Sequence, residues 1–130
     1  MTVGYLADAC ALIVFLTSPD ADRTMPNAAR IMRTSEIRVS PITVWEITRK
    51  AALGKLRLTW GPHPSLTALL RTEGYILQPL GWDDAEQANR LPPRHKDPMD
   101  RMLIATALRN DLTIITNDAA FAAYGVPTIW

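Results

Sequence analysis

Short apolar runs alternate with helix-length segments along this chain. Residues 3–7 form one such run, which ends at Asp8 and leads into the apolar segment 9–16, and residues 112–116 form the clearest one. Strands that are apolar without polar alternation are buried on both faces, as in parallel sheets covered by helices. The pattern therefore predicts an α/β fold, namely a three-layer α/β/α domain with a short, mainly parallel sheet.

Prolines, glycines and capping residues divide the rest of the chain into further elements. Ser40 and Pro41 have the residue types of an N-cap and a first helical turn, and Gly54 is a natural residue to end that helix. Connections are expected at 18–24, 58–64 and 91–96. Further strands are expected at 37–39, 75–77 and 126–129, and further helices at 26–33, 41–54, 65–72, 82–90, 98–109 and 119–124.

The composition fits one globular domain over residues 1–130. Hydrophobic residues make up 48% and charged residues 21% of the chain, and no stretch approaches the roughly 20 apolar residues of a membrane span. The segment 9–16 has no preceding Lys or Arg and no small-residue cleavage pattern, so we expect neither a signal peptide nor a membrane partner. The single cysteine, Cys10, cannot form an intramolecular disulfide, which is typical of a cytoplasmic protein.

The net charge of +1 is too small for the chain to hold a nucleic acid by surplus charge alone. Any role on nucleic acid therefore depends on local chemistry. Candidate phosphate contacts come from a basic set around the start of the helix expected at 98–109, which otherwise forms an ordinary solvated loop: Arg94, His95, Lys96 and Arg101.

Five acidic residues are expected near one edge of the sheet. Ligands of open parallel sheets bind outside the carboxyl ends of the strands, so the residues that follow each strand are the ones of interest. Asp8 follows the first strand directly, and Asp118 follows the strand at 112–116 after one further residue. The others begin the helix at 98–109 or lie in the helix at 41–54: Asp97, Asp100 and Glu46.

Each of these carboxylates also has an ordinary structural explanation. An aspartate at an N-cap stabilises its helix by about 1 kcal/mol without any function, and a carboxylate in a first turn, such as Asp100, is favoured by the helix dipole. Glu46 has basic residues three and four positions further on, which is the spacing of a solvated ion pair, although its apolar neighbours also allow a position at the margin of a buried face. Three of the five stand at expected N-caps: Asp8, Asp97 and Asp118.

Convergence of these carboxylates favours a divalent cation. Two like charges about 4 Å apart repel by roughly 4 kcal/mol at an effective dielectric constant of 20, and Mg²⁺ or Mn²⁺, which prefer carboxylate and water oxygens, relieve this repulsion. A zinc site is excluded in practice, because His63 and His95 stand alone and Cys10 has no second cysteine. A hard divalent ion activates water and offsets phosphate charge, which suits phosphodiester hydrolysis.

Five short segments, in this order and spacing, make the chain resemble the PIN-domain family, and within it the VapC-type toxins of bacterial toxin–antitoxin pairs. They are LAD at 6–8, SPITVWEI at 40–47, AALGKL at 51–56, KDPMDRMLIA at 96–105 and TND at 116–118. The tail GVPTIW at 125–130 also resembles the ending of this subgroup.

The resemblance implies a Mg²⁺- or Mn²⁺-dependent endoribonuclease, with an RNA substrate, a cognate VapB-like antitoxin that obstructs the acidic pocket, and a homodimer. Asp97 matches a further acidic position of the subgroup, and Thr116 matches a hydroxyl-bearing position near the site. Cys10 departs from the family, which usually has Ser, Thr or His there, so a polar contact to the metal site is expected to be missing or altered. The positions that match the acidic metal site of the family are Asp8, Glu46, Asp100 and Asp118.

Other classes fit the sequence less well. A haloacid-dehalogenase-like phosphatase needs a second Asp two residues after the first, where this chain has Cys10. A phospho-accepting receiver domain needs an Asp after its third strand and a Lys after a late strand, but residues 75–79 contain no Asp and no Lys follows Lys96. The alternative that stays open is a catalytically silent PIN-like module that binds RNA or protein.

Three tryptophans are candidates for contact with an antitoxin if they are exposed. A lone tryptophan is more often buried, so we expect them in the core: Trp45, Trp60 and Trp82.

Overall fold

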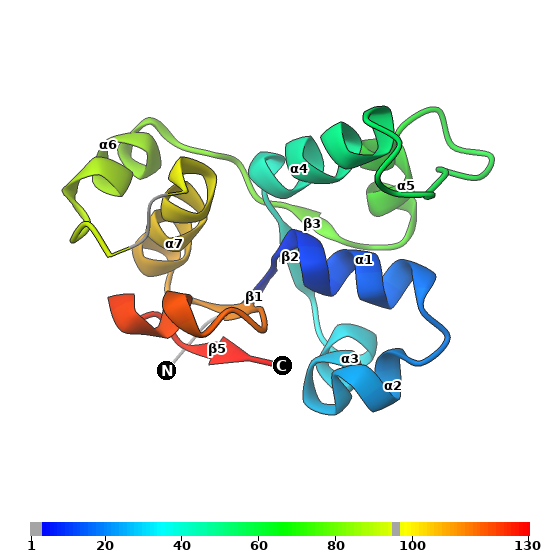
Figure 1. Cartoon of the computed structure of the whole chain (residues 1–130), viewed down its shortest axis with the longest axis horizontal. Helices are drawn as coiled ribbons and strands as arrows, with labels where there is room; N and C mark the ends of the chain where they lie inside the picture. Colours follow the sequence, from blue (N-terminus) through cyan, green and yellow to red (C-terminus); the bar gives the residue numbers. More distant parts are fainter. Residues whose placement is uncertain (1–3, 95–96) are drawn as a thin grey trace.

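The computed structural model describes residues 4–94 and 97–130, and shows strands flanked by helices (Figure 1). Its strands are β1 (Gly4–Ala7), β2 (Ile37–Val39), β3 (Ile76–Leu77), β4 (Leu112–Ile115) and β5 (Thr128–Ile129). Its helices are α1 (Ala9–Thr17), α2 (Ala21–Thr24), α3 (Pro26–Thr34), α4 (Pro41–Ala52), α5 (Leu66–Thr72), α6 (Trp82–Arg90), α7 (Pro98–Asn110) and the 3₁₀ helix η1 (Ala119–Tyr124).

All described strands pair in parallel, in the order β3-β2-β1-β4-β5. The chain first builds the sheet outward from β1 to β3 and then crosses to the other side of β1, so the order reverses between β1 and β4. Four residues of β1 pair with β4, and Ala7 lies opposite Ile115 at the carboxyl ends of the two strands. The predicted α/β fold with a short parallel sheet is confirmed.

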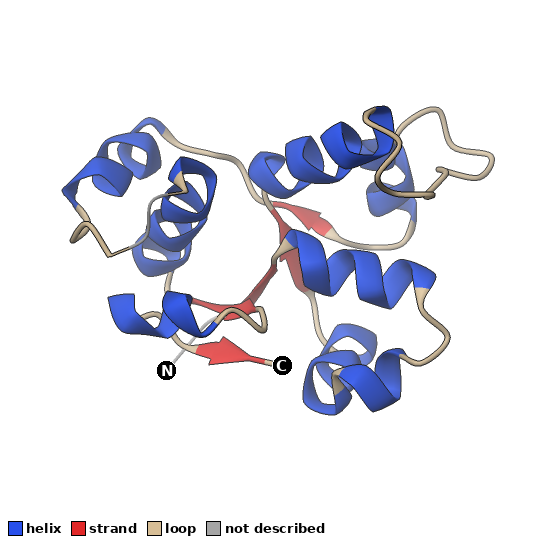
Figure 2. Cartoon of the chain, in the orientation of Figure 1, coloured by secondary structure: helices blue, strands red, loops and turns tan. Residues whose placement is uncertain are grey.

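Two apolar cores lie on opposite faces of this sheet. Leu6 belongs to the core made with α6, α7 and η1, whereas its neighbour Ala7 belongs to the core made with α1 to α5. Ile114 and Ile115 of β4 divide in the same way. Figure 2 shows the strands between these two groups of helices. The alternation of side chains along each strand thus produces the three layers that the apolar runs predict.

Capping residues set the helix boundaries at the carboxyl edge of the sheet. Side-chain oxygens of Asp8 and Ser40 accept hydrogen bonds from backbone N–H groups of α1 and α4, at 2.8 and 3.0 Å. Asp97 does the same for α7, at 2.9 Å. Gly54 follows α4 with a φ of 72°, a left-handed conformation that a residue with a side chain adopts only with strain. These are the residues on which the predicted boundaries rest.

The structure differs from the sequence prediction in several places. Residues 21–24, expected to be part of a connection, form the short helix α2, because Ala21 packs into the core and its carbonyl accepts from the N–H of Met25. The strands at 75–77 and 126–129 shrink to two residues each. No helix in the described residues is long and apolar enough to cross a membrane.

Two of the three tryptophans expected in the core are exposed. Trp82 is 92% exposed at the first position of α6, and Trp45 is 48% exposed on α4. Helices α4 and α6 pack against the rest of the protein through other faces. The exposure of each tryptophan therefore follows from its place on the helix and not from its hydrophobicity. Trp60 is partly buried against the larger core, as expected.

Candidate functional site

Asp8 lies where the order of the strands reverses. It follows β1 directly, and its backbone N–H donates to the carbonyl of Ile115 at 3.1 Å, which extends the pairing of β1 with β4 by one bond. Its carboxylate also caps α1 through the N–H of Ala11. Because ligands of open α/β sheets bind at this reversal point, Asp8 is both a structural cap and a side chain at the expected site.

Asp118 reaches the same point from the end of β4. Its N–H donates to the hydroxyl oxygen of Thr116 at 3.1 Å, and its carboxylate caps η1 through the N–H of Ala120 at 2.9 Å. Thr116 is 3% exposed, and its hydroxyl also forms a hydrogen bond with the Asp8 carboxylate. One buried hydroxyl therefore joins the residues that follow β1 and β4.

Glu46 is brought to this edge by the first turns of α4. The hydroxyl of Thr43, which is 2% exposed, donates to the carbonyl of Ala7 at 3.3 Å. Glu46 lies three residues further on and therefore on the same face of the helix. Its carboxylate accepts from the Lys50 ammonium at 3.3 Å. Both explanations drawn from the sequence hold, since Glu46 pairs with a basic residue and also lines a cavity beside the core.

These carboxylates share a cavity of about 170 Å³ with Asp100, which lies in the first turn of α7. Helices α4 and α7 contact each other, so the cavity is closed by elements from both faces of the sheet. Asp97 caps α7 and does not line it. The polar lining residues are Asp8, Cys10, Thr43, Glu46, Asp100 and Asp118, and the apolar ones are Ala9, Ile42, Leu103 and Phe121.

Thr43 and Cys10 are lining residues that the sequence prediction did not include among the site residues. Thr43 had a sequence signal, since a polar side chain three residues before Glu46 shares its helix face. Cys10 is two residues after Asp8, on the first turn of α1, and its side chain is exposed. Although the residue is exposed, partial burial of its sulfur raises the pKa of the Cys10 thiol, and the nearby Asp8 carboxylate raises it further.

The electrostatics of the cavity disfavour the charged form of Asp8. Partial burial raises the pKa of the Asp8 carboxyl above its ordinary value of 3.8, and the negative charges of Glu46 and Asp118 raise it further. Hydrogen bonds from the Thr116 hydroxyl and the Ala11 N–H oppose the shift. A positive charge in the cavity would favour the ionised form of Asp8.

The donor set fits a hard divalent cation. Four carboxylates around one cavity provide the oxygen ligands that Mg²⁺ and Mn²⁺ prefer. Among residues 4–94 and 97–130, no group of three or more His, Cys, Asp or Glu side chains is arranged so that it would hold an ion as it stands. Coordination therefore requires the side chains around the cavity to draw together.

The two described arginines of the basic set bind backbone carbonyls. Arg94 donates to the carbonyl of Ala123 at 2.6 Å. Arg101 donates to the carbonyls of Leu91 and Pro92 at 2.7 and 2.8 Å, and so ties the segment after α6 to α7. Both guanidinium groups thus have structural partners, Arg94 at η1 and Arg101 at the segment after α6. His95 and Lys96 lie outside the described residues.

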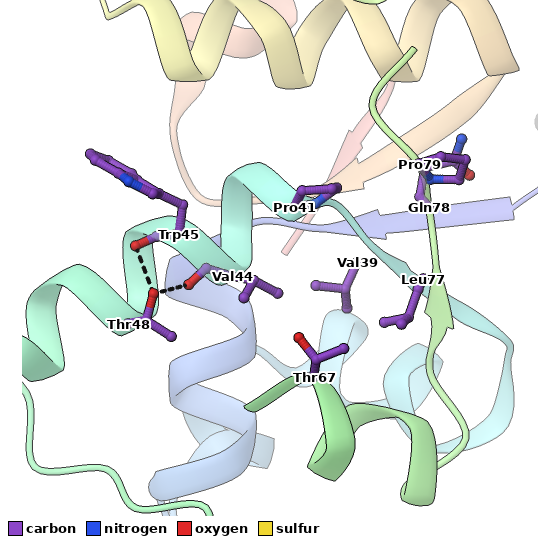
Figure 3. A pocket seen from close by; sticks show the side chains of 9 residues that line it. All are labelled: Val39, Pro41, Val44, Trp45, Thr48, Thr67, Leu77, Gln78 and Pro79. Atoms are coloured by element: carbon purple, nitrogen blue, oxygen red, sulfur yellow. Dashed lines mark hydrogen bonds between the residues drawn. The ribbon is translucent and has the colours of Figure 1, made fainter. Parts of the chain in front are cut away.

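A second, larger cavity of about 500 Å³ lies on the other side of α4 (Figure 3). Its lining is mainly apolar and includes no carboxylate: Val39, Pro41, Val44, Trp45, Thr48, Thr67, Leu77, Gln78 and Pro79. The Thr48 hydroxyl donates to the carbonyls of Val44 and Trp45 within α4. Its larger size does not make it the reactive site, because it offers no acid, base or metal ligand.

The sequence matches the model of the PIN domain family over residues 5–127. This match spans both cores and every side chain that lines the 170 Å³ cavity. No curated protein sequence matches the chain.

Solved structures share the fold at low sequence identity. VapBC2 from Rickettsia felis, bound to a DNA fragment from its promoter, is 13% identical with a TM-score of 0.68, and the match covers 97% of each chain. A toxin–antitoxin complex from Klebsiella pneumoniae is 18% identical with a TM-score of 0.66, over 97% of this chain and 96% of that one. VapC20 from Mycobacterium tuberculosis, a sarcin–ricin loop cleaving toxin, is 16% identical with a TM-score of 0.64, over 94% of this chain and 95% of that one.

Proposed function

Because the chain belongs to the PIN domain family, we propose that it is a divalent-metal-dependent endoribonuclease that hydrolyses RNA phosphodiester bonds. The observation that carries this proposal is the meeting of Asp8, Glu46, Asp100 and Asp118 around one cavity. They come from four separate parts of the chain and meet where the strand order reverses. Helix capping alone would not require these side chains to lie around one cavity.

The four carboxylates are held in three ways. Asp8 and Asp118 are fixed by the helices that they cap and by the Thr116 hydroxyl between them. Glu46 is fixed by α4, which the Thr43 hydroxyl ties to the end of β1. Asp100 enters from α7, which Asp97 caps. Because the four side chains come from separate elements, small side-chain movements can bring their carboxylates to one cation while the backbone stays in place.

Mg²⁺ or Mn²⁺ is the proposed cofactor, with Asp8, Glu46, Asp100 and Asp118 as its carboxylate ligands. When bound, such an ion supplies an acidified water as the nucleophile and positive charge against the scissile phosphate. Thr116 keeps the Asp8 carboxylate oriented and favours its ionised form. No covalent bond between the protein and the RNA is needed, and Cys10 is not proposed as a nucleophile.

RNA is the proposed substrate because VapC20, which shares this fold, is a sarcin–ricin loop cleaving toxin. With a net charge of +1, the chain would rely on the cation and on local basic side chains to offset phosphate charge. Arg94, Lys96 and Arg101 are proposed for that second task. Arg101 lies in the first turns of α7 and binds the carbonyls of Leu91 and Pro92, and Arg94 is held at η1 by the carbonyl of Ala123.

The proposed role is that of the toxin in a bacterial toxin–antitoxin pair. Structural relatives from Rickettsia felis, Klebsiella pneumoniae and Salmonella typhimurium are toxin–antitoxin or VapBC complexes. By analogy, the partner is a VapB-like antitoxin, and the toxin acts in the cytoplasm as a homodimer. The exposed Trp45 and Trp82 side chains are the proposed contacts for such partners.

The test is cleavage of structured and unstructured RNA by the purified protein with Mg²⁺, with Mn²⁺ and with a chelator. The Asp100→Asn variant, purified identically, controls for a contaminating nuclease. We expect cleavage that needs the divalent ion and is lost in the variant. RNA binding without cleavage under every divalent ion would instead favour the catalytically silent module.

A further inference from the structure

Lys50 brings a positive charge to the edge of the acidic cavity. It lies in the last turn of α4, and its ammonium Nζ is 3.3 Å from Oε2 of Glu46, one of the lining carboxylates. The same charge acts on the Cys10 thiol, where it opposes the rise in pKa that burial and Asp8 cause. Because Cys10 and Glu46 both line the cavity, the two interactions together place the Lys50 ammonium at its rim.

The Lys50 ammonium is open to solvent as well as to the cavity. The side chain of Lys50 is 46% exposed, and that of Glu46 is 31% exposed. The adjacent basic residue behaves differently, because the Arg49 guanidinium lies over the Trp45 ring, 5.3 Å from the ring centre. Trp45 lines the apolar cavity on the other side of α4. Two neighbouring basic residues of one helix therefore serve different surfaces.

The partner of Lys50 distinguishes it from the arginines already proposed to contact phosphate. Arg94 and Arg101 donate to backbone carbonyls, which carry no full charge. Lys50 is instead paired with Glu46, whose carboxylate is a proposed metal ligand. Offsetting the negative charge of that carboxylate weakens its attraction for the ammonium. The pair is therefore weakest in the state in which the site would take up RNA.

We propose that Lys50 is a substrate-binding residue that changes its partner, from the Glu46 carboxylate in the free protein to a backbone phosphate of the RNA once the charge of Glu46 is offset. This inference rests on the proposed ribonuclease function and adds a residue that binds its substrate. A phosphate oxygen replaces a carboxylate oxygen as the acceptor of a charge-assisted hydrogen bond from Nζ. Pairing with Glu46 leaves the ammonium with less attraction for phosphate in the free protein.

The test measures RNA binding in the presence of a chelator, so that neither cleavage nor bound metal contributes. Glu46→Gln removes the charge of the carboxylate without an ion and releases the Lys50 ammonium. The probe is a fluorescently labelled single-stranded RNA oligonucleotide, whose affinity is measured by anisotropy over a series of salt concentrations. The slope of log affinity against log salt reports how many phosphates the basic side chains neutralise.

Lys50→Met should make this slope shallower by about 0.7 in the Glu46→Gln background, which is the contribution of one phosphate contact on a single strand. The same substitution should change the slope less in the wild-type background, because Lys50 is paired with Glu46 there. Lys50→Arg keeps the charge and should keep the slope in both backgrounds. Arg49→Met is the matched control, because it removes the same charge from the same turn of α4 and should act equally in both backgrounds.

Circular dichroism verifies that each variant is folded, and an exposed pair four residues apart contributes little to stability. Equal effects of Lys50→Met in the two backgrounds would overturn the proposal. An effect of Lys50→Met no larger than that of Arg49→Met in the Glu46→Gln background would also overturn it. Failure of the proposed ribonuclease function shows separately, as absence of RNA cleavage by the wild type with Mn²⁺.

Discussion

The hydroxyl of Thr43 donates a hydrogen bond of 3.3 Å to the carbonyl oxygen of Ala7, and so links the first turn of α4 to the last residue of β1. The two residues are 36 positions apart in the chain. This bond satisfies a buried carbonyl and sets the position of α4 relative to β1. The distance between Glu46 on α4 and Asp8 after β1 depends on that position.

Thr43→Val keeps the shape of this side chain and removes its hydroxyl. We expect the free energy of unfolding to fall by roughly 1 to 2 kcal/mol, because a buried carbonyl loses a partner. The loss should be smaller for Thr48→Val, whose hydroxyl bonds only to carbonyls of its own helix. Urea denaturation of both variants measures the difference. Equal losses of unfolding free energy would show that the bond to Ala7 contributes no more to stability than a bond within α4.

Asp8→Asn should stabilise the metal-free protein at neutral pH while it removes a proposed metal ligand. The raised pKa of Asp8 means that the folded state binds this proton more tightly than the unfolded state does. Ionised Asp8 therefore costs stability above its folded pKa, and this cost disappears as the pH falls through that value to below 3.8. Asparagine also caps helices well, so α1 keeps its cap.

Denaturation with a chelator present, as a function of pH, measures the effect of Asp8→Asn. The variant should exceed the wild type in stability at pH 7, and this advantage should shrink as the pH is lowered. A variant that is less stable than the wild type at pH 7 would contradict the assigned direction of the pKa shift.

Asp97 and Asp100 should respond differently to the same substitution. Asp97 caps α7 through the N–H of Met99 and does not line the cavity, so Asp97→Asn should retain most of the cleavage activity. Asp97→Ala should cost about 1 kcal/mol in stability, because it removes the cap. Asp100→Asn should lose activity with little change in stability. If Asp97→Asn lost as much cleavage as Asp100→Asn, Asp97 would have to be counted as a ligand.

Asp84 is a buried acidic residue with a structural role. Its carboxylate accepts from the N–H of Gly81 at 2.8 Å and from Nε of Arg109 at 2.9 Å, which joins α6 to α7. Asp84→Ala should lower the free energy of unfolding by roughly 2 kcal/mol, since it removes the acceptor of the Gly81 N–H and of the Arg109 Nε, and Arg109 keeps only its bond to Asp83. Thermal denaturation tests this, with Asp83→Ala as the control, because Asp83 binds the same Arg109 at 3.2 Å but from an exposed position. Equal effects of the two variants would contradict it.

The sequence predicted most of the fold because local signals agree with the tertiary structure. Asp8, Ser40 and Asp97 are caps by residue type and by observed hydrogen bonds. The apolar runs became the central strands β1 and β4, which are buried on both faces. The sequence signals were weakest where tertiary packing determines the local conformation. Helix α2 is an example, because its buried Ala21 is not part of a periodic apolar pattern.

The four carboxylates of the candidate site were predictable from the sequence, but its other polar lining residues, Cys10 and Thr43, were not among the predicted site residues. Asp8 and Asp118 follow strands, so parallel pairing alone brings them to one edge. The link from Thr43 to Ala7 was not predictable, because it joins residues far apart in the chain. The exposure of Trp82 was not predictable either, because it depends on which face of α6 packs against α7.

If the carboxylates of one cavity act together in RNA cleavage, each of them should be needed for the initial cleavage rate with Mn²⁺, which single amide variants measure. Asp8→Asn, Asp118→Asn and Glu46→Gln test the cavity, and Asp83→Asn is the matched control on the surface of α6. Circular dichroism verifies that each variant is folded. We expect each cavity variant to lose at least about 100-fold in rate, which is a few kcal/mol in the barrier, while Asp83→Asn keeps the wild-type rate. A folded Asp8→Asn or Asp118→Asn variant that cleaves at the wild-type rate would contradict it.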